Sequence, residues 1–289
     1  MNNNEQTLFS ALKDALSLSR PEAFTKLDEE LKLLEKNFSH QQFNYLFAIA
    51  PSPRWFNGAP MIPQSIDLLK PFDDHHKISN WTCSQVARLT ILLALYNLVE
   101  KDTYIACINE LFKTADMNEL TMLVQSLPHI PEKEAFVERA REAARSNIEQ
   151  VFCAVAHQSD FAKCFFDAAG WNQLILKAAF LAVPIWPIIG LRERSNPELA
   201  LMLADYARER QAAGRDLPWD LYCCIGWQAK TNEDMSFLKQ QYQIGSEEIQ
   251  SAILSSLSEN GSAKALDTAK SLGAKNEPKS WQEIALLHA

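Results

Sequence analysis

The residue types best suited to chemistry gather in one segment, residues 171–210. A nearly continuous apolar stretch begins at Trp171, and three polar side chains interrupt it: Asn172, Gln173 and Lys177. A helix that is apolar on every side is normally buried, and a buried polar group requires a hydrogen-bond partner or a cavity. Lys177 and Gln173, one turn apart, would present a cation and an amide to an anionic ligand. A lysine that extends from a buried helix to solvent is the simpler alternative.

Two arginines stand immediately before the position where a new helix is expected to begin. Arg192 and Arg194 precede Asn196-Pro197, and asparagine followed by proline is typical of a helix N-terminus. Guanidinium groups beside the free backbone N–H groups of a helix N-terminus are suited to a phosphate or a carboxylate. Solvated loop arginines, with Asn196 as a plain N-cap, are the alternative interpretation.

The sequence permits two functions for this segment, in which Tyr206 and Glu209 lie farther along the same expected helix. The first is a binding or scaffold protein that holds a small molecule, or a protein of the same pathway, on a concave face. Its predicted ligand-binding residues are Trp171, Asn172, Gln173, Lys177, Arg192, Arg194, Asn196 and Tyr206. The second is a cofactor-independent isomerase or lyase, with Lys177 as base or electrostatic stabiliser and Tyr206 or Glu209 as proton donor. We prefer the first, because polar groups in helices are often structural.

Metal and cofactor motifs do not favour an enzyme. Glu198, Asp205 and Glu209 would gather carboxylates on one helix face, but neighbouring arginines favour a charged face toward solvent. The Asp-Asp-His-His run at 73–76 indicates a solvated turn, because a polar loop does not preform a metal site. The sequence contains no nucleophile elbow, glycine-rich phosphate loop or HExxH motif. We expect no metal and no cofactor.

Composition and charge argue against several classes of partner. The 289-residue chain has a net charge of -8 and no cluster of Lys or Arg, which disfavours nucleic acid and anionic membranes. The longest apolar run, 174–191, contains Lys177 and two prolines and is too short to span a bilayer. We therefore expect no transmembrane segment. The N-terminus has no features of a secretory signal, and the six cysteines form no CxxC pair. We expect a cytoplasmic protein with reduced, mostly buried thiols.

The rest of the chain indicates helices throughout. Only eight glycines occur, and apolar residues recur at three- and four-residue spacing with little strict alternation. Expected helix starts are at Pro21, Ser39, Asn80, Asp116, Pro131, Asn196-Pro197 and Thr231. Expected stops are at Gly214 and Gly273, where a left-handed residue after a helix is least costly. The predicted fold class is all-α.

The number of helices favours a stacked array over a single bundle. More than a dozen would overfill one simple bundle, so we expect a HEAT- or armadillo-like right-handed helical superhelix of antiparallel helix pairs. We expect a domain at 1–228 and C-terminal helical repeats at 229–289, packed on as part of the same body. Within the first, we expect helices at 1–50, an irregular connection at 51–79 and a core region at 80–228.

Several segments, in order, resemble the EboA family. They are NWTCSQVARLTILLAL at 80–95, ELTMLVQSLPHIP at 119–131, ARSNIEQVFCAVA at 144–156, WNQLILKAAF at 171–180 and GLRERSNPELALMLADYARER at 190–210, followed by AAGRDLP. The resemblance covers residues 80–226 and implies a helical, HEAT-like fold. Genes of this family tend to lie in bacterial clusters beside prenyltransferase-like, sugar-phosphate-isomerase-like and metal-hydrolase-like neighbours. The resemblance therefore implies a part in making or moving a small-molecule precursor of secondary metabolism.

The chain departs from the family pattern at three places. It has Trp186 where the pattern has a histidine, so a catalytic or ligating role of that histidine in relatives would be lost here. It also has Arg208 in place of a histidine, and residues 158–162 in place of an Asn-Pro-Tyr-Pro-like turn. Tryptophans such as Trp186 and Trp219 either anchor the core or line a pocket for an apolar or prenylated compound.

Overall fold

The chain is helical throughout the part that the structure describes. A computed structural model describes residues 1–73, 77–157, 159–273 and 280–287. These residues form 17 α-helices and three short 3₁₀ helices, with one isolated bridge between Pro60 and Thr82 in place of any strand. The all-α prediction is confirmed. None of the helices described is long and apolar enough to cross a membrane.

The helices divide between two compact units, residues 1–166 and 167–289. Unit 1 contains α1 (Asn3–Ser19), α2 (Pro21–Lys36), α3 (His40–Ile49), α4 (Pro63–Leu69), α5 (Cys83–Leu98), α6 (Lys101–Thr114), α7 (Met117–Ser126), α8 (Val137–Arg145), α9 (Glu149–Ala156) and α10 (Phe161–Phe165), with the 3₁₀ helices η1 (Lys70–Phe72), η2 (Ile78–Asn80) and η3 (Lys133–Phe136). Unit 2 contains α11 (Ala168–Leu181), α12 (Pro197–Ala212), α13 (Leu221–Gln228), α14 (Asn232–Ile244), α15 (Glu247–Asn260), α16 (Ala263–Ser271) and α17 (Trp281–Leu287). The predicted division at residue 228 falls inside unit 2.

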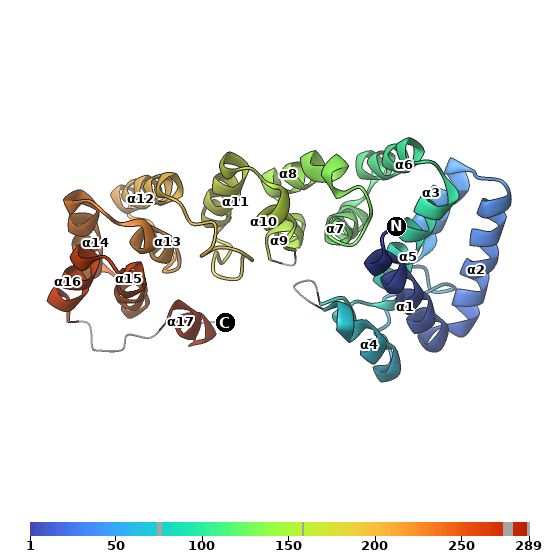
Figure 1. Cartoon of the computed structure of the whole chain (residues 1–289), viewed down its shortest axis with the longest axis horizontal. Helices are drawn as coiled ribbons and strands as arrows, with labels where there is room; N and C mark the ends of the chain where they lie inside the picture. The colour runs from blue at the N-terminus through green and yellow to red at the C-terminus, as the bar shows by residue number, and fades with distance from the viewer. Residues whose placement is uncertain (74–76, 158, 274–279, 288–289) are drawn as a thin grey trace. The chain divides into compact units, whose positions relative to one another are not determined.

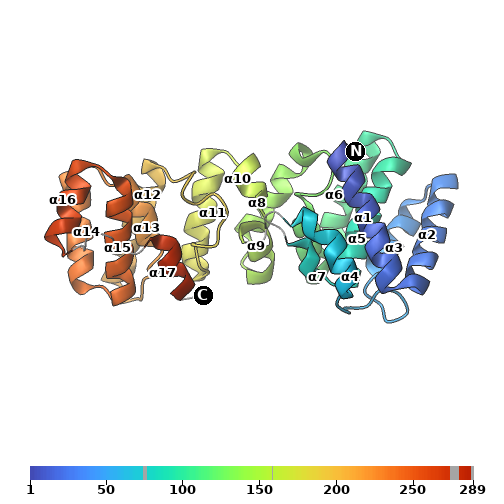
Figure 2. The same ribbon diagram turned by 60° about the horizontal axis from the view of Figure 1, so that its bottom comes forward.

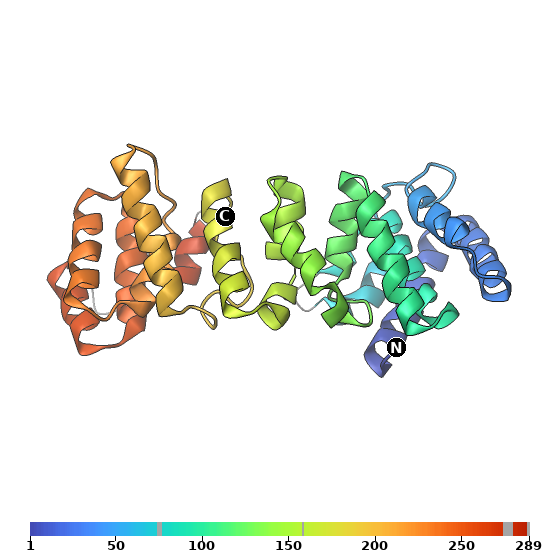
Figure 3. The same cartoon turned by 90° about the horizontal axis from the view of Figure 1, so that it is seen from above.

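Helix α5 is the centre of unit 1. Its residues from Val86 to Leu95 are all buried, and it packs against α1, α2, α3, α6 and α7. Figure 1 shows α6 and α8 in one layer and α7 and α9 in the other. Seen from above, these green helices follow one another along the unit (Figure 3). The apolar faces are thus buried between two layers of short helices.

Helix α15 has the same central place in unit 2. It packs against α13, α14, α16 and α17, and Figure 2 shows α13 and α17 on one side of it and α14 and α16 on the other. The approach to α13 is close at Gly226, where a Cβ atom would lie 1.9 Å from the Ser256 Oγ. Helices on both sides of residue 228 therefore share one core.

Most predicted helix boundaries agree with the structure because they rest on local capping. The predicted capping residues that accept a backbone N–H in the structure are Ser39, Asp116, Asn196 and Thr231. Gly214 and Gly273 follow helix ends with φ of 65° and 90°, as expected. The predicted start of α5 at Asn80 was wrong. Asn80 ends the 3₁₀ turn η2, and Thr82 is the N-cap of α5.

The connection predicted to be irregular at 51–79 contains ordered, buried structure. Helix α4 packs on α1, and the buried Ser65 hydroxyl donates to the Ala15 carbonyl at 2.8 Å. Pro63 occupies the first turn of α4, where its missing N–H is tolerated, so this proline marks a helix start and not a loop. In the predicted solvated turn at 73–76, Asp73 accepts the Ser79 N–H at 2.8 Å. The rest of that turn lies outside the described residues.

Candidate functional site

Four of the predicted site residues meet at the N-terminus of α12. The buried Asn172 amide pairs with that of Asn196, with 2.8 Å from Asn196 Nδ2 to Asn172 Oδ1. Asn196 also accepts the Leu199 N–H at 2.9 Å and donates to the Arg194 carbonyl at 3.1 Å. The Arg194 guanidinium stacks 4.8 Å from the centroid of the fully buried Trp171 ring. These contacts hold the N-cap of α12 against α11.

Arg192 belongs to a different cluster, which joins the turn before α12 to the C-terminal helices. Its guanidinium lies 4.9 Å from the Trp227 ring centroid, and its Nε lies 3.8 Å from the Glu259 Oε2. Trp227 Nε1 donates to the same carboxylate oxygen at 2.8 Å. The positive charge of Arg192 therefore already has a carboxylate partner in α15.

The remaining predicted residues lie along the surfaces of α11 and α12. Gln173 is exposed, and the half-buried Lys177 places its Nζ 5.2 Å from the centroid of the Phe180 ring. Tyr206 donates its hydroxyl to the Ala179 carbonyl at 2.9 Å, and Glu209 is exposed. The structure therefore brings Trp171, Asn172, Arg194 and Asn196 together, and places Arg192 in a separate cluster.

A cavity of about 320 Å³ opens between the loop after α11 and the segment that leads into α13. The chain turns sharply at both borders. Ala182 ends α11 in the left-handed conformation with φ of 56°, and Gly214 follows α12 with φ of 65°. The residues that line it include Pro184, Trp186, Arg210, Asp216, Trp219 and Asp220. None of the eight predicted ligand-binding residues is among the described residues that line it, whereas Trp186 and Trp219, which the sequence allows as either core anchors or pocket residues, both line it.

Asp220 is the buried acid of this cavity. Its exposed fraction is only 2%, and its Oδ2 accepts the backbone N–H groups of Ile185 at 2.6 Å and Trp186 at 3.1 Å. Its Oδ1 is buried as well and has no hydrogen-bond partner among the described residues. Leaving a buried polar atom unsatisfied costs about 1–3 kcal/mol. Asp220 also lines the cavity, so a ligand that reaches this oxygen would gain a hydrogen bond.

The same burial sets the protonation of Asp220. Loss of solvation raises the pKa of the Asp220 carboxyl, and interactions with the backbone N–H groups of Ile185, Trp186, Asp220 and Leu221 offset part of this effect. A ligand that donates a hydrogen bond to Oδ1 would favour the ionised carboxylate. Both a hydroxyl group and an ammonium group meet this requirement.

Two tryptophans and several apolar residues form much of the remaining cavity wall, together with the charged residues Arg210 and Asp216. Trp186 and Trp219 are half-buried and offer flat apolar surfaces. Arg210 on α12 donates from Nη2 to the Asp216 carbonyl at 2.8 Å, and its guanidinium lies 5.9 Å from the Tyr206 ring centroid. The predicted residue Tyr206 therefore contacts the cavity lining through Arg210. This surface suits a ligand with an apolar body and one hydrogen-bond donor.

Sequence reasoning did not select Asp220. The available signal was an acid directly before the apolar run at 221–227, a position typical of a helix N-terminus. Its burial depends on Ile185 and Trp186, which lie about 35 residues earlier in the chain. No group of three or more His, Cys, Asp or Glu side chains within the described ranges could hold a metal ion.

Comparison with known proteins identifies one family. No curated protein and no solved structure matches the chain. A family model described as "Metabolite traffic protein EboA" matches residues 6–226. The match spans nearly all of unit 1 and the part of unit 2 from α11 into α13, which includes every cavity residue named above. Because this family model matches most of the length of the chain, the chain belongs to the EboA family.

Proposed function

We propose that this protein binds a small-molecule metabolite in the cavity beside Asp220. The observation that carries the proposal is the buried Asp220 Oδ1, which has no hydrogen-bond partner among the described residues. Buried polar atoms in proteins are nearly always satisfied, and exceptions often mark binding or catalytic positions. The family description as a metabolite traffic protein supports a small-molecule ligand.

The chemistry of the cavity defines the ligand by two features. Trp186 and Trp219 stack on an apolar or unsaturated body, and Asp220 accepts a hydrogen bond from a hydroxyl or ammonium group. The volume of about 320 Å³ accommodates a small metabolite and not a macromolecule.

In the cell, this protein acts as a cytoplasmic binding or scaffold protein of an Ebo-type bacterial pathway for a secondary-metabolite precursor. The two-layered succession of short helices in unit 1 supports a helical-repeat scaffold of HEAT or armadillo type. Other proteins of the pathway are its proposed partners, together with the ligand. The residues around Asn196 and around Arg192 stay predicted ligand-binding positions. In the sequence they lie between the two segments that form this cavity.

The geometry favours binding over the enzyme alternative. That alternative uses Lys177 as base or electrostatic stabiliser and Tyr206 or Glu209 as proton donor, which needs a closed pocket with Lys177 at its wall. Lys177 instead lies half-buried beside the exposed Phe180 ring, and Glu209 is exposed. The Tyr206 hydroxyl is engaged with the Ala179 carbonyl.

Native mass spectrometry of the full chain after incubation with a bacterial metabolite extract tests the proposal. We expect a discrete added mass on the wild-type protein and at least about tenfold weaker retention in Asp220→Asn, because a hydrogen bond to a charged group is lost. The matched control is Asp267→Asn, an exposed aspartate of α16 that does not line the cavity, which should retain the ligand.

Two further variants locate the ligand if it binds elsewhere. Loss of the added mass in Lys177→Ala or Arg192→Ala, but not in Asp220→Asn, would place the ligand at the predicted positions and overturn the assignment to this cavity. Absence of any added mass on the wild type would favour a scaffold that acts through protein partners.

A further inference from the structure

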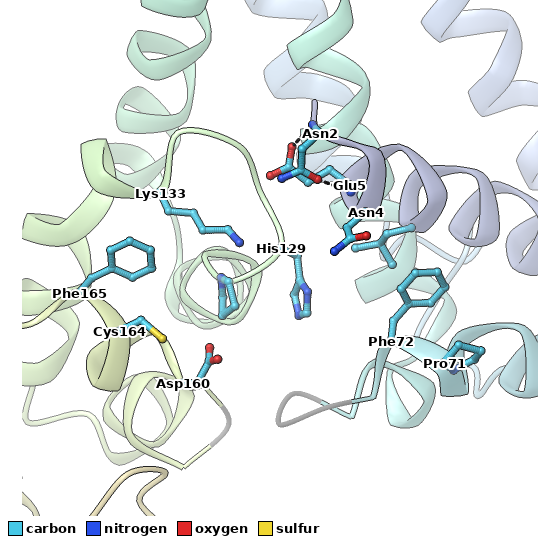
Figure 4. A pocket seen from close by; sticks show the side chains of 12 residues that line it. Asn2, Asn4, Glu5, Pro71, Phe72, His129, Lys133, Asp160, Cys164 and Phe165 are labelled. Atoms are coloured by element: carbon cyan, nitrogen blue, oxygen red, sulfur yellow. Dashed lines mark hydrogen bonds between the residues drawn. The ribbon is translucent and has the colours of Figure 1, made fainter. Parts of the chain in front are cut away.

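Unit 1 contains a cavity of about 490 Å³ that shares no lining residue with the Asp220 cavity. It lies among the first turns of α1, the 3₁₀ helix η1, the turn after α7, and α10. Figure 4 shows the His129 ring projecting into it from the turn after α7, and the Lys133 side chain projecting from the start of η3. Asp160 and Cys164 face it from the α10 side, and Phe72 lies on the opposite wall. Titratable groups that converge on a cavity indicate a binding site.

The backbone that directs Lys133 is held in a strained conformation. Glu132 has a φ of 59°, in the left-handed region that residues other than glycine rarely adopt. Its carboxylate is fixed by two partners, the Lys101 Nζ at 2.5 Å and the Tyr96 hydroxyl at 3.0 Å. Such strain persists only where surrounding contacts enforce it, and it is common at ligand sites. The Glu132 contacts therefore fix the backbone from which Lys133 extends.

His129 is fixed by packing. Its exposed fraction is 8%, its backbone N–H donates to the Ser126 carbonyl at 2.9 Å, and its ring meets the Trp81 ring edge-on at 5.7 Å between centroids. An imidazole ring nitrogen that carries a proton can donate to an anion. His129 and Lys133 thus present nitrogen donors to the same space, and packing holds the His129 ring in place.

We propose that this cavity binds a small hydroxylated organic anion, held through its acidic group by Lys133 and His129. A phosphate or carboxylate oxygen accepts from both side chains, and the ammonium group supplies the charge. The acid on the α10 side, Asp160, favours a ligand that also donates hydrogen bonds, and hydroxyl groups meet this condition. The Asn4 amide on α1 offers a further donor and acceptor. This site is independent of the Asp220 cavity.

Calorimetric titration of the full chain with glycerol 3-phosphate and with glycerate tests the proposal. We expect saturable binding of at least one probe by the wild type, and at least about tenfold weaker binding by Lys133→Gln, which keeps much of the length of the side chain and removes its charge. Lys113→Gln, an exposed lysine of α6, is the matched control and should bind as the wild type does.

A second readout uses Cys164, which lines the cavity and is exposed. The bound probe should slow its alkylation by iodoacetamide in the wild type and not in Lys133→Gln. Equal binding by the wild type and Lys133→Gln, or no saturable binding of either probe, would overturn the proposal. Asp220→Asn should bind these probes normally, so failure here is distinguishable from failure of the proposed function.

Discussion

The side-chain amides of Asn172 and Asn196 hydrogen-bond each other in both directions, at 2.8 Å and 3.4 Å, across the space between α11 and α12. This pairing explains how a polar residue is accommodated on the buried face of α11. Asn172 orients the side chain that caps α12, and that cap accepts the Leu199 N–H. The helix that precedes the Asp220 cavity and the helix that carries Arg210 are thereby joined.

Replacement of Asn172 by leucine should destabilise the protein. The change leaves the Asn196 amide without its buried partner and weakens the cap of α12, which we expect to cost about 1–3 kcal/mol. Chemical denaturation monitored by circular dichroism measures it. Gln173→Leu, at the exposed neighbouring position, is the control and should lie within about 0.5 kcal/mol of the wild type. Equal effects of the two changes would contradict a structural role for the pair.

Gly226→Ala should destabilise unit 2. The new Cβ would lie 1.9 Å from the Ser256 Oγ and 2.6 Å from its Cβ, so α13 and α15 must move apart. Overpacking of this kind costs about 1–3 kcal/mol. Gly58→Ala, where nothing lies within 4 Å, serves as the control. The double variant Gly226→Ala/Ser256→Gly should recover part of the loss, and strict additivity in this cycle would argue against the predicted clash.

Glu119→Gln should destabilise the folded protein, although the two side chains are nearly equal in size and shape. Its partner Arg88 has a side chain that is only 8% exposed, and Arg88 Nη2 lies 3.2 Å from the Glu119 Oε1. Removal of one member of a buried ion pair leaves the other charge uncompensated, at a cost of about 3 kcal/mol. Thermal and urea unfolding measure the loss. Glu110→Gln, at an exposed pair with Lys113, should be nearly silent, and a similar loss there would refute the argument.

Asp220→Asn should gain stability relative to the wild type as pH rises. Because burial raises the pKa of the Asp220 carboxyl in the folded state, the folded protein holds this proton more tightly than the unfolded chain. The wild type therefore loses stability from this group as pH rises from about 4, near the unfolded value, to the folded pKa. Urea unfolding at a series of pH values measures the difference. Asp216→Asn is the control, and the same pH dependence in both variants would contradict this origin.

The cysteines should differ sharply in reactivity. Burial raises the pKa of the Cys223 and Cys224 thiols, and both side chains are inaccessible, whereas Cys164 is exposed. Iodoacetamide should label Cys164 in the folded protein and reach the other two only after unfolding. Peptide mapping by mass spectrometry after timed quenching distinguishes them. Labelling of Cys223 in the folded protein at the rate of Cys164 would show that α13 opens readily.

Helix content and most boundaries could be predicted because they depend on neighbours in the sequence. Asp116 and Thr231 each form a capping box within four residues. The start of α5 was misplaced because Asn80 also resembles a cap, and only the structure shows that it ends a 3₁₀ turn while Thr82 pairs with Gln85. Two adjacent cap signals cannot be ranked from local sequence alone.

The candidate site was less predictable because it depends on contacts between distant segments. The polar residues Asn172 and Arg192 suggested a site by their types, yet one supports a helix cap and the other pairs with Glu259. Asp220 appeared ordinary in sequence, and its unusual burial arises only when the loop that holds Ile185 folds over it. Helix α4 was missed for a related reason, since its proline-rich surroundings conceal the apolar face that packs on α1.

The family match ends at residue 226, two residues before the end of α13, although that helix depends on the later helices α14 and α15. The Asn260 amide donates to the carbonyls of Gly226, Trp227 and Ala229 at 2.9–3.0 Å, and Tyr222 donates to Gln241 at 2.8 Å. The segment that the family model matches therefore ends before the segment that folds together with α13. A relative that shares only the matched part must shield its last helix by other means, through a substitute segment or a second chain.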